Sequence, residues 1–171
     1  MVDMSLFPNV SILEVEAVPP EAILNLPLTF PKLRLLKFER ACIFSVPYIF
    51  PHEASMPLLT HLKCSLCALD ELSGLDFNPP PLRSLSTLQS LNLSHNNILN
   101  HTTALAGLSS LVNLQKVDLS HNYISTMDGA NGMLGNIKVL LLTGNRISSG
   151  KVRLGRGANA ASRLMLPYTT S

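Results

Sequence analysis

The sequence contains no tryptophan, few aromatic residues and few charges, and these shortages exclude several classes of protein. Aromatic residues make up 5% and charged residues 14% of the 171 residues. A chain that stays disordered is usually rich in charge and poor in apolar residues, whereas 46% of this chain is hydrophobic. We therefore expect one domain with a continuous core, built mainly from Leu, Val and Ile because aromatics are scarce.

Cysteine and long apolar runs are also scarce. Three cysteines, an odd number, do not make a disulfide framework. The first residues, Met1 to Pro8, lack the basic and apolar regions of a secretory signal peptide. No apolar stretch approaches the roughly 18 residues of a membrane helix. These features predict a cytoplasmic protein with no membrane span. Glycosylation sequons at Asn9, Asn92 and Asn100 leave an extracellular recognition domain open as an alternative.

Charge is unevenly distributed along the chain. Residues 1–149 have a net charge of −2, whereas residues 150–171 contain four cations and no acid, a net charge of +4. The body of the chain is not a nucleic-acid-binding surface by charge. Four cations without interleaved aromatics are a weak indication of nucleic-acid or membrane binding. We therefore expect no nucleic-acid partner.

Leucine at regular spacing is what the sequence has in abundance. The clearest copy of the pattern L-x-x-L-x-L-x-x-N-x-L is formed by Leu88, Leu91, Leu93, Asn96 and Ile98. The pattern returns at residues 114 and 137, and in weaker form at residues 10, 33 and 59. The starts lie 23 to 29 residues apart, which is the spacing of leucine-rich repeats.

The repeat predicts an α/β fold, a right-handed leucine-rich-repeat solenoid of about six turns. Each L-x-L pair is expected to form a short strand with both side chains inward, because side chains alternate across a strand. Stacked turns then form a parallel concave sheet, with short 3₁₀, helical or irregular segments on the convex side. We expect the solenoid to span residues 1–149. Residues 150–171 are expected to form a basic tail containing Gly and Ala, either disordered or a truncated non-repeat end.

The polar position after each strand is expected to be structural. It holds Cys67, Asn96, Asn122 and Asn145 in successive turns. A buried amide there can donate to and accept from backbone groups that would otherwise lack partners. The pair Cys64 and Cys67 is interpreted as two buried structural cysteines rather than a redox or zinc site. Cys42 lies outside the inward positions and is expected to be a free thiol.

The outward residues of the strands define the expected binding surface. The partner-binding residues predicted on the concave face are Lys37, Arg40, His61, Lys63, Asn92, His95, Lys116, Asp118, His121 and Leu141. The cations make the middle of the face mildly basic, and Leu141 adds an apolar anchor. His95 and His121 occupy the same position in successive turns, which leaves metal binding or pH sensing open. Since no third ligand is evident, solvated rings are the simpler interpretation.

No arrangement of residues points to catalysis, a cofactor or a metal. Residues 144–151 approximate a phosphate loop but have five residues between the glycines, and Val152 stands in place of the Ser or Thr that would bind magnesium. Residues 155–160 imitate the dinucleotide fingerprint without the strand, helix and acid that it requires. We therefore expect a protein that is not an enzyme and has no cofactor.

Residues 88–147 contain two copies of Leu-Ser-His-Asn and a period of 23 to 26 residues. They resemble the short intracellular leucine-rich repeats of the protein phosphatase 1 regulatory-subunit type, and residues 7–20 resemble the nischarin-like repeat region. The resemblance implies a scaffold, adaptor or regulatory subunit that binds a protein on its concave sheet. Such partners include phosphatase or kinase subunits, small GTPases and receptor tails.

The ends of the predicted solenoid lack a clear polar cap, which solenoids need to cover their terminal turns. One alternative is therefore a truncated isoform or fragment of a longer repeat protein with no independent activity. Weak self-association through the uncapped ends is also open.

Overall fold

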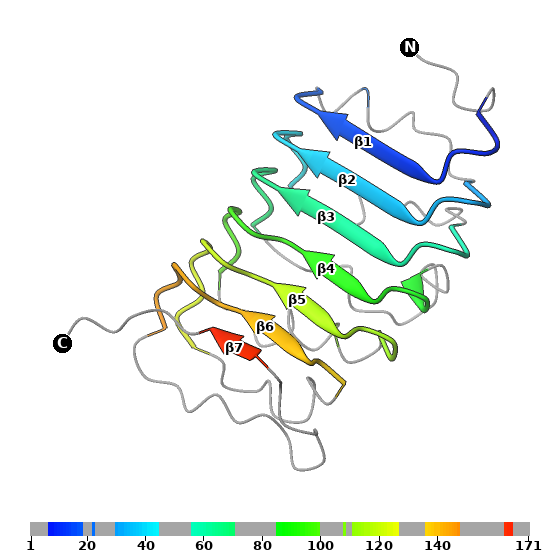
Figure 1. Ribbon diagram of the computed structural model, residues 1–171. Coiled ribbons are helices and arrows are strands. Elements are labelled where there is room, and N and C mark those ends of the chain that lie inside the picture. Colours follow the sequence, from blue (N-terminus) through cyan, green and yellow to red (C-terminus); the bar gives the residue numbers. More distant parts are fainter. Residues whose placement is uncertain are drawn as a thin grey trace.

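The computed structural model describes residues 7–18, 22, 30–44, 56–70, 85–99, 108, 111–126, 136–147 and 163–165. Within them the chain forms one parallel sheet whose seven strands follow one another in chain order (Figure 1). The strands are β1 Ile12–Glu16, β2 Leu35–Glu39, β3 His61–Ser65, β4 Ser90–Asn92, β5 Lys116–Asp118, β6 Val139–Leu141 and β7 Arg163–Met165. Each of the first six strands begins two residues after a predicted repeat start, so the six expected repeats are confirmed.

Equivalent positions of successive repeats lie side by side in the sheet. The first inward residues pair in register from β1 to β6 and are Leu13, Leu36, Leu62, Leu91, Val117 and Leu140. From β2 onward these side chains are buried in one continuous core behind the sheet, whereas Leu13 and Val15 of β1 are only partly buried. Burying a leucine completely contributes about 2 kcal/mol, so this ladder is the main source of stability.

A tight turn precedes each of the first five strands, and the repeat pattern alone did not predict it. In each turn the first residue of the repeat donates its N–H to the carbonyl three residues earlier, at 2.8–3.2 Å; these donors are Val10, Leu33, Leu59, Leu88 and Leu114. Pro8, Pro31 and Pro57 follow the accepting residue in the first three turns. Proline is favoured there because its fixed φ matches that of a turn. The turn sets where each strand begins.

After the strand in each of the first six turns, a residue adopts the left-handed backbone conformation, and the chain changes direction there. We call it the corner residue. The corner residues have φ between 51° and 73° and are Ala17, Arg40, Leu66, His95, His121 and Gly144. This conformation costs a non-glycine residue about 1 kcal/mol. Hydrogen bonds to the next turn offset the cost: the N–H of His95 donates to Ser120 O at 2.9 Å, and the N–H of Arg40 donates to Ser65 O at 3.2 Å.

The sheet extends beyond the boundary expected at residue 149. β7 pairs in parallel with β6, with Leu140 beside Leu164 and Leu141 beside Met165. The expectation of a non-repeat tail over residues 150–171 did not include this strand. The sequence contains a partial copy of the pattern, because Leu164 and Leu166 keep the L-x-L spacing. Ala161 occupies the first leucine position, which is why the copy was missed.

The convex side lies mostly outside the described residues. Leu85, which begins the tight turn before β4, and Leu108 have 3₁₀ conformation, whereas the three prolines after Asn78 and the rest of residues 150–171 apart from β7 lie outside the described part. Across that described part, no helix has the length and apolarity needed to cross a bilayer.

Candidate functional site

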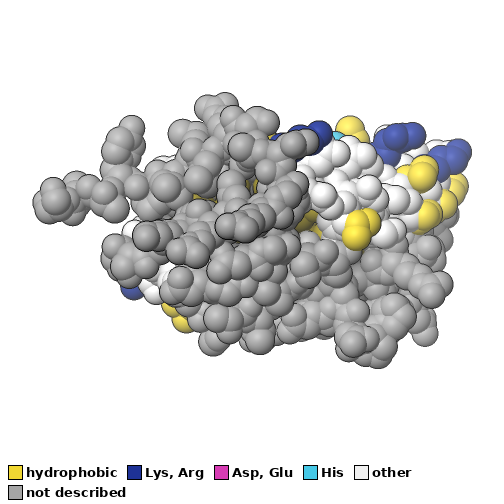
Figure 2. Space-filling model, turned by 90° about the horizontal axis from the view of Figure 1, so that it is seen from below, with side chains coloured by type: hydrophobic (Ala, Val, Ile, Leu, Met, Phe, Trp, Pro, Cys, Tyr) yellow, Lys and Arg dark blue, Asp and Glu magenta, His cyan; other side chains and the backbone are white. Residues whose placement is uncertain are grey.

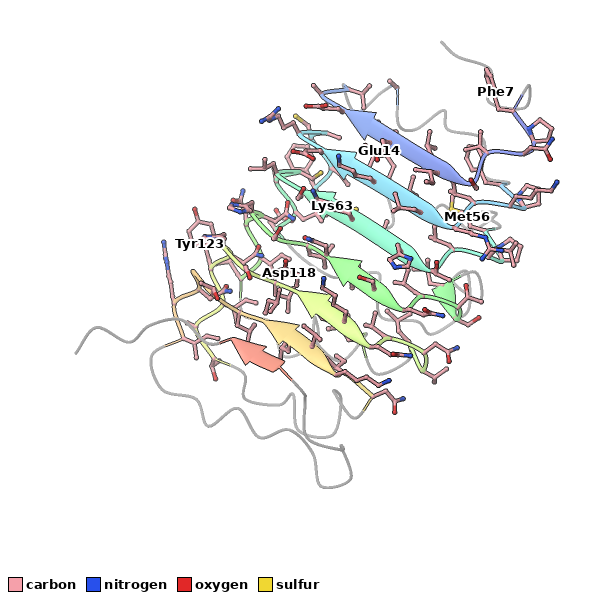
Figure 3. The ribbon with its side chains drawn as sticks, in the orientation of Figure 1. Phe7, Glu14, Met56, Lys63, Asp118 and Tyr123 are labelled. Carbon is pink, nitrogen blue, oxygen red and sulfur yellow. The ribbon has the colours of Figure 1, made fainter. Side chains whose placement is uncertain are left out.

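The outward side chains of β1 to β6 form the concave face, which is turned toward the viewer in Figure 3 with Glu14, Lys63 and Asp118 labelled. The central column pairs in register across the sheet and consists of Glu14, Lys37, Lys63, Asn92, Asp118 and Leu141. Seven of the predicted partner-binding residues therefore lie on the strands that form this face; besides five of that column they are His61 and Lys116.

Ion pairs cover the N-terminal half of the concave face. Lys37 Nζ lies 3.1 Å from Glu14 Oε2 and 3.3 Å from Glu39 Oε2, and Lys63 Nζ lies 3.5 Å from the same Glu39 oxygen. Hydrogen bonds with Glu14 and Glu39 raise the pKa of Lys37, and the hydrogen bond from Lys37 lowers the pKa of Glu39. Lys37 and Lys63, two of the cations expected to make this face basic, are thus paired with carboxylates of the same or the neighbouring strand.

The C-terminal half of the concave face is organised by side-chain caps instead of ion pairs. Asn92 Oδ1 accepts from the N–H of Ser94 at 2.9 Å, and Asp118 Oδ1 accepts from the N–H of Ser120 at 3.0 Å. Asn92 Nδ2 also donates to Asp118 Oδ2 at 3.4 Å across the two strands. β4 and β5 end at these capping residues, two residues earlier in the repeat than β1 to β3.

Two of the predicted partner-binding residues in this half, Lys116 and Leu141, have side chains that could contact a partner. Lys116 is exposed and has no ion pair among the described residues, and Leu141 is half-buried on β6. Val139 stands beside Lys116 in register and is also half-buried. This part of the face combines a cation with apolar side chains.

Arg40, His95 and His121 lie at the corners beyond the strands rather than on the strands of the concave face. Arg40 Nη1 lies 3.0 Å from Glu16 Oε1 in an exposed ion pair. The exposed rings of His95 and His121 stack with centroids 4.2 Å apart and planes 12° apart. Ring nitrogens carry their lone pairs in the ring plane, so stacked rings do not converge on a common ion.

Gly144 continues this corner column beside His121. A Cβ at Gly144 would lie 2.5 Å from His121 Nδ1, and the backbone φ of Gly144 is 73°. The close approach to the imidazole and the positive φ both require glycine here. In the part of the chain that the structure describes, no group of three or more His, Cys, Asp or Glu side chains is placed to hold a metal ion.

Tyr123 and Arg146 make a contact that the sequence analysis missed. The guanidinium carbon of Arg146 lies 4.4 Å from the Tyr123 ring centroid, a cation–π distance. The two residues occupy the same position, directly after the structural Asn, in successive repeats. Comparing that position between repeats would have predicted their proximity.

The asparagines at the polar position, buried at Asn122 and half-buried at Asn145, bond to backbone groups of the preceding turn. Asn122 Oδ1 accepts from the N–H of Ile98 at 3.1 Å, and Asn122 Nδ2 donates to Leu93 O at 2.9 Å, both in the preceding turn. Asn145 repeats the arrangement with the N–H of Ile124 at 3.0 Å. These side chains thereby form hydrogen bonds with backbone N–H and C=O groups that lie outside the sheet.

The cysteines behave as the repeat pattern predicts. Cys64 and Cys67 are buried, and Cys67 Sγ in the asparagine position donates to Ser65 O at 3.2 Å and Phe38 O at 3.6 Å. Burial raises the pKa of both thiols, so they stay protonated and poorly nucleophilic. Cys42 is free and exposed.

This stack of parallel strands, inward leucines and bridging asparagines defines a leucine-rich-repeat solenoid. The family model described as Leucine Rich Repeat matches residues 87–111 and 113–131. Among solved structures, the leucine-rich repeat domain of APL1B is similar with a TM-score of 0.58 and 16% identity, over 92% of this chain. The chain spans 48% of the length of that structure, and similarity at this identity establishes the fold alone. No curated protein matches the chain in sequence.

Leucine-rich repeats indicate a module for protein–protein interaction, and folds of this kind are typically not enzymes. The finer resemblances to protein phosphatase 1 regulatory subunits and to nischarin receive no support from these comparisons.

Proposed function

We propose that the protein is a scaffold, adaptor or regulatory subunit that binds a protein partner on the concave face over β3 to β6. The observation that carries this proposal is the contrast between the halves of the face. The N-terminal lysines already pair with Glu14 and Glu39, whereas Lys116 and Leu141 have outward side chains without such partners among the described residues.

A partner that lies over β4 to β6 has no ion pair between described residues to break, because the ion pairs of the face join Glu14, Lys37, Glu39 and Lys63 on β1 to β3. Half-exposed Val139 and Leu141 offer apolar contact on β6, and exposed Lys116 on β5 and His61 on β3 offer polar contact beside it. Interfaces commonly combine apolar and polar contacts in this way. The proposed binding site therefore comprises the outward residues of β3 to β6.

We propose that the protein is cytoplasmic, and the state of its cysteines supports this proposal. Cys42, Cys64 and Cys67 are all free, which suits a reducing compartment. Glycan attachment at Asn92 would disrupt its hydrogen bonds with Asp118 and Ser94, which counts against an extracellular site at that sequon. The sequence resemblance supports phosphatase or kinase subunits, small GTPases and receptor tails as partner classes to test first.

The test compares two double variants of the full chain in partner capture and then in titration calorimetry with the captured protein. His61→Glu with Leu141→Glu places two acids on the concave face, and Cys42→Glu with Asn97→Glu places two at exposed positions two residues after the corner residues Arg40 and His95. Both variants must first melt like the parent. We expect the concave variant to bind about tenfold more weakly and the control to stay within about twofold of the parent. Equal affinity of the two variants would move the site away from the concave face.

A further inference from the structure

A second surface follows the start of the strands. We define the strand-start rim as residues 7–12, 30–35, 56–61, 85–90, 111–116 and 136–139, which cover the five tight turns described above and the first residue of each strand from β1 to β6. The rim contains four cations, Lys32, Arg34, Lys116 and Lys138, and no Asp or Glu. All acidic residues of the described part lie further along their repeats; they are Glu14, Glu16, Glu39, Asp70 and Asp118. The described acids are therefore confined to positions beyond the rim, whereas described cations lie both on the rim and beyond it.

The rim cations differ from the other described cations in their partners. Lys37, Arg40 and Lys63 pair with carboxylates, and Arg146 lies over Tyr123. None of the four rim cations pairs with a carboxylate among the described residues. Two of them bond to neutral amides instead: Lys32 Nζ donates to Asn9 Oδ1 at 2.6 Å, and Lys138 Nζ donates to Gln115 Oε1 at 3.1 Å. The rim therefore keeps its positive charge.

Large apolar side chains are exposed on the same rim. Phe7 is 48%, Ile12 59%, Leu58 42% and Val112 60% exposed. Figure 2 shows Lys, Arg and hydrophobic side chains together at the right of the view, the side where the strands of Figure 1 begin, with no described acidic side chain among them. A surface with both cations and apolar groups, and no acid, is complementary to an acidic ligand that also has apolar groups.

We infer that the strand-start rim binds an extended acidic segment of a partner protein, with carboxylates on both sides of an apolar residue. The rim cations form two groups, Lys32 with Arg34 in the second turn, and Lys116 with Lys138 in the fifth and sixth turns. Leu58 and amide side chains lie between them. At about 4.8 Å between strands, the second and fifth turns are about 14 Å apart, which about four extended residues span.

The spacing favours a peptide over a polyanion with evenly repeated charges. A nucleic acid contacts cations along a continuous track, whereas the third and fourth turns of the rim have Leu58, Gln89 and no Lys or Arg. The site also differs from the concave site proposed above, because Lys32, Arg34 and Lys138 precede their strands. Lys116 begins β5 and borders both surfaces, so it is left unchanged in the test.

The test uses fluorescence anisotropy with the full chain and a labelled synthetic peptide. In the peptide two pairs of glutamates flank a central leucine, and the reference peptide has glutamine in place of every glutamate. The rim variant is Lys32→Gln, Arg34→Gln and Lys138→Gln. Its matched control removes three charges elsewhere through Arg40→Gln, Lys63→Gln and Arg146→Gln. Thermal melts establish that both variants fold like the parent.

We expect the glutamate peptide to bind the parent about tenfold more tightly than the reference peptide at low ionic strength, and to weaken as salt is added. The rim variant should lose about tenfold in affinity, and the control should stay within about twofold. The single concave substitution Leu141→Glu, which lies outside the rim, should retain peptide binding, which separates this inference from the proposed function.

Three results would overturn the inference. One is the absence of glutamate-peptide binding by the parent, and another is an equal loss in the rim and control variants, which would indicate a dependence on net charge alone. The third is tighter binding of phosphatidylserine vesicles or single-stranded DNA than of the peptide, lost in the rim variant, which would assign the rim to another class of ligand.

Discussion

Replacing Asn122 with leucine would test whether the buried amides hold neighbouring turns together. The Asn122 side chain is 3% exposed, and its Oδ1 is the acceptor for the N–H of Ile98 at 3.1 Å. Its Nδ2 donates to Leu93 O, Leu119 O and Ser120 O at 2.9–3.2 Å. Each of these three carbonyls keeps a second donor, from Asn96, Asn145 and His95 respectively. The substitution therefore leaves one buried amide, that of Ile98, without a partner.

The expected loss of stability follows from the hydrogen bonds that Asn122→Leu removes. One unpaired buried N–H costs about 2 kcal/mol, and losing one of two donors at three carbonyls adds about 1 kcal/mol. Asn122→Leu should therefore lower the free energy of unfolding by about 3 kcal/mol, a fall of about 9 °C in Tm for a chain of this size. Among the described residues, Asn96 Oδ1 is the side-chain acceptor for two amides, those of Cys67 at 2.9 Å and Leu69 at 3.2 Å. Asn96→Leu should cost about 2 kcal/mol more.

Urea unfolding followed by far-ultraviolet circular dichroism measures both effects. Asn97→Leu is the matched control, because Asn97 is the exposed neighbour of Asn96 and its substitution should change stability by less than about 0.5 kcal/mol. The reasoning is refuted if Asn122→Leu unfolds at the same urea concentration as Asn97→Leu. It is also refuted if Asn96→Leu is less destabilising than Asn122→Leu, since the order follows directly from the number of unpaired amides.

Three further predictions follow from single sites. Gly144→Ala should cost about 2 kcal/mol in urea unfolding, because φ is 73° and the added Cβ would lie 2.5 Å from His121 Nδ1; an unchanged midpoint would contradict this. Because Lys37 lowers the pKa of Glu39, ionised Glu39 stabilises the folded state above its ordinary pKa, and that stabilisation is lost as pH falls through the lowered pKa. Thermal melts between about pH 5 and pH 3 should therefore show a weaker pH dependence for Glu39→Gln than for the parent, and identical slopes would count against the ion pair. A thiol reagent should modify Cys42 alone in the native protein and all three cysteines after denaturation, since the other two are buried with raised pKa values; rapid modification of all three in the folded state would disprove this.

The repeat pattern was sufficient to predict the first six strands, their register and the core. Each inward leucine of a stacked turn can be buried only against the equivalent leucines of the neighbouring turns. It was also sufficient for the structural role of Cys67 and the asparagines, since a polar side chain at that buried position must pair with backbone. β7 escaped prediction because Ala161 replaces the leucine that begins the other repeats.

The charges of the binding surfaces were less predictable, because pairing depends on side chains from different turns. Lys37 and Glu14 are 23 residues apart, and Arg40 and Glu16 are 24 apart. Considering the cations of the concave face without the acids beside them suggested a basic surface that the ion pairs neutralise. The acid-free strand-start rim could have been found by counting charges at each repeat position, because position in the repeat fixes position in the sheet.

The bonds of the asparagines run in one direction, and this has a consequence for synthesis on the ribosome. Asn96 completes the third turn at Leu69, Asn122 completes the fourth at Ile98, and Asn145 completes the fifth at Ile124. Since the N-terminus emerges first, each of these turns must wait for the following one before its backbone is paired. At about 5 to 20 residues per second, one repeat of roughly 25 residues takes about 1 to 5 s to make. The growing end of the nascent solenoid therefore always carries one unfinished turn.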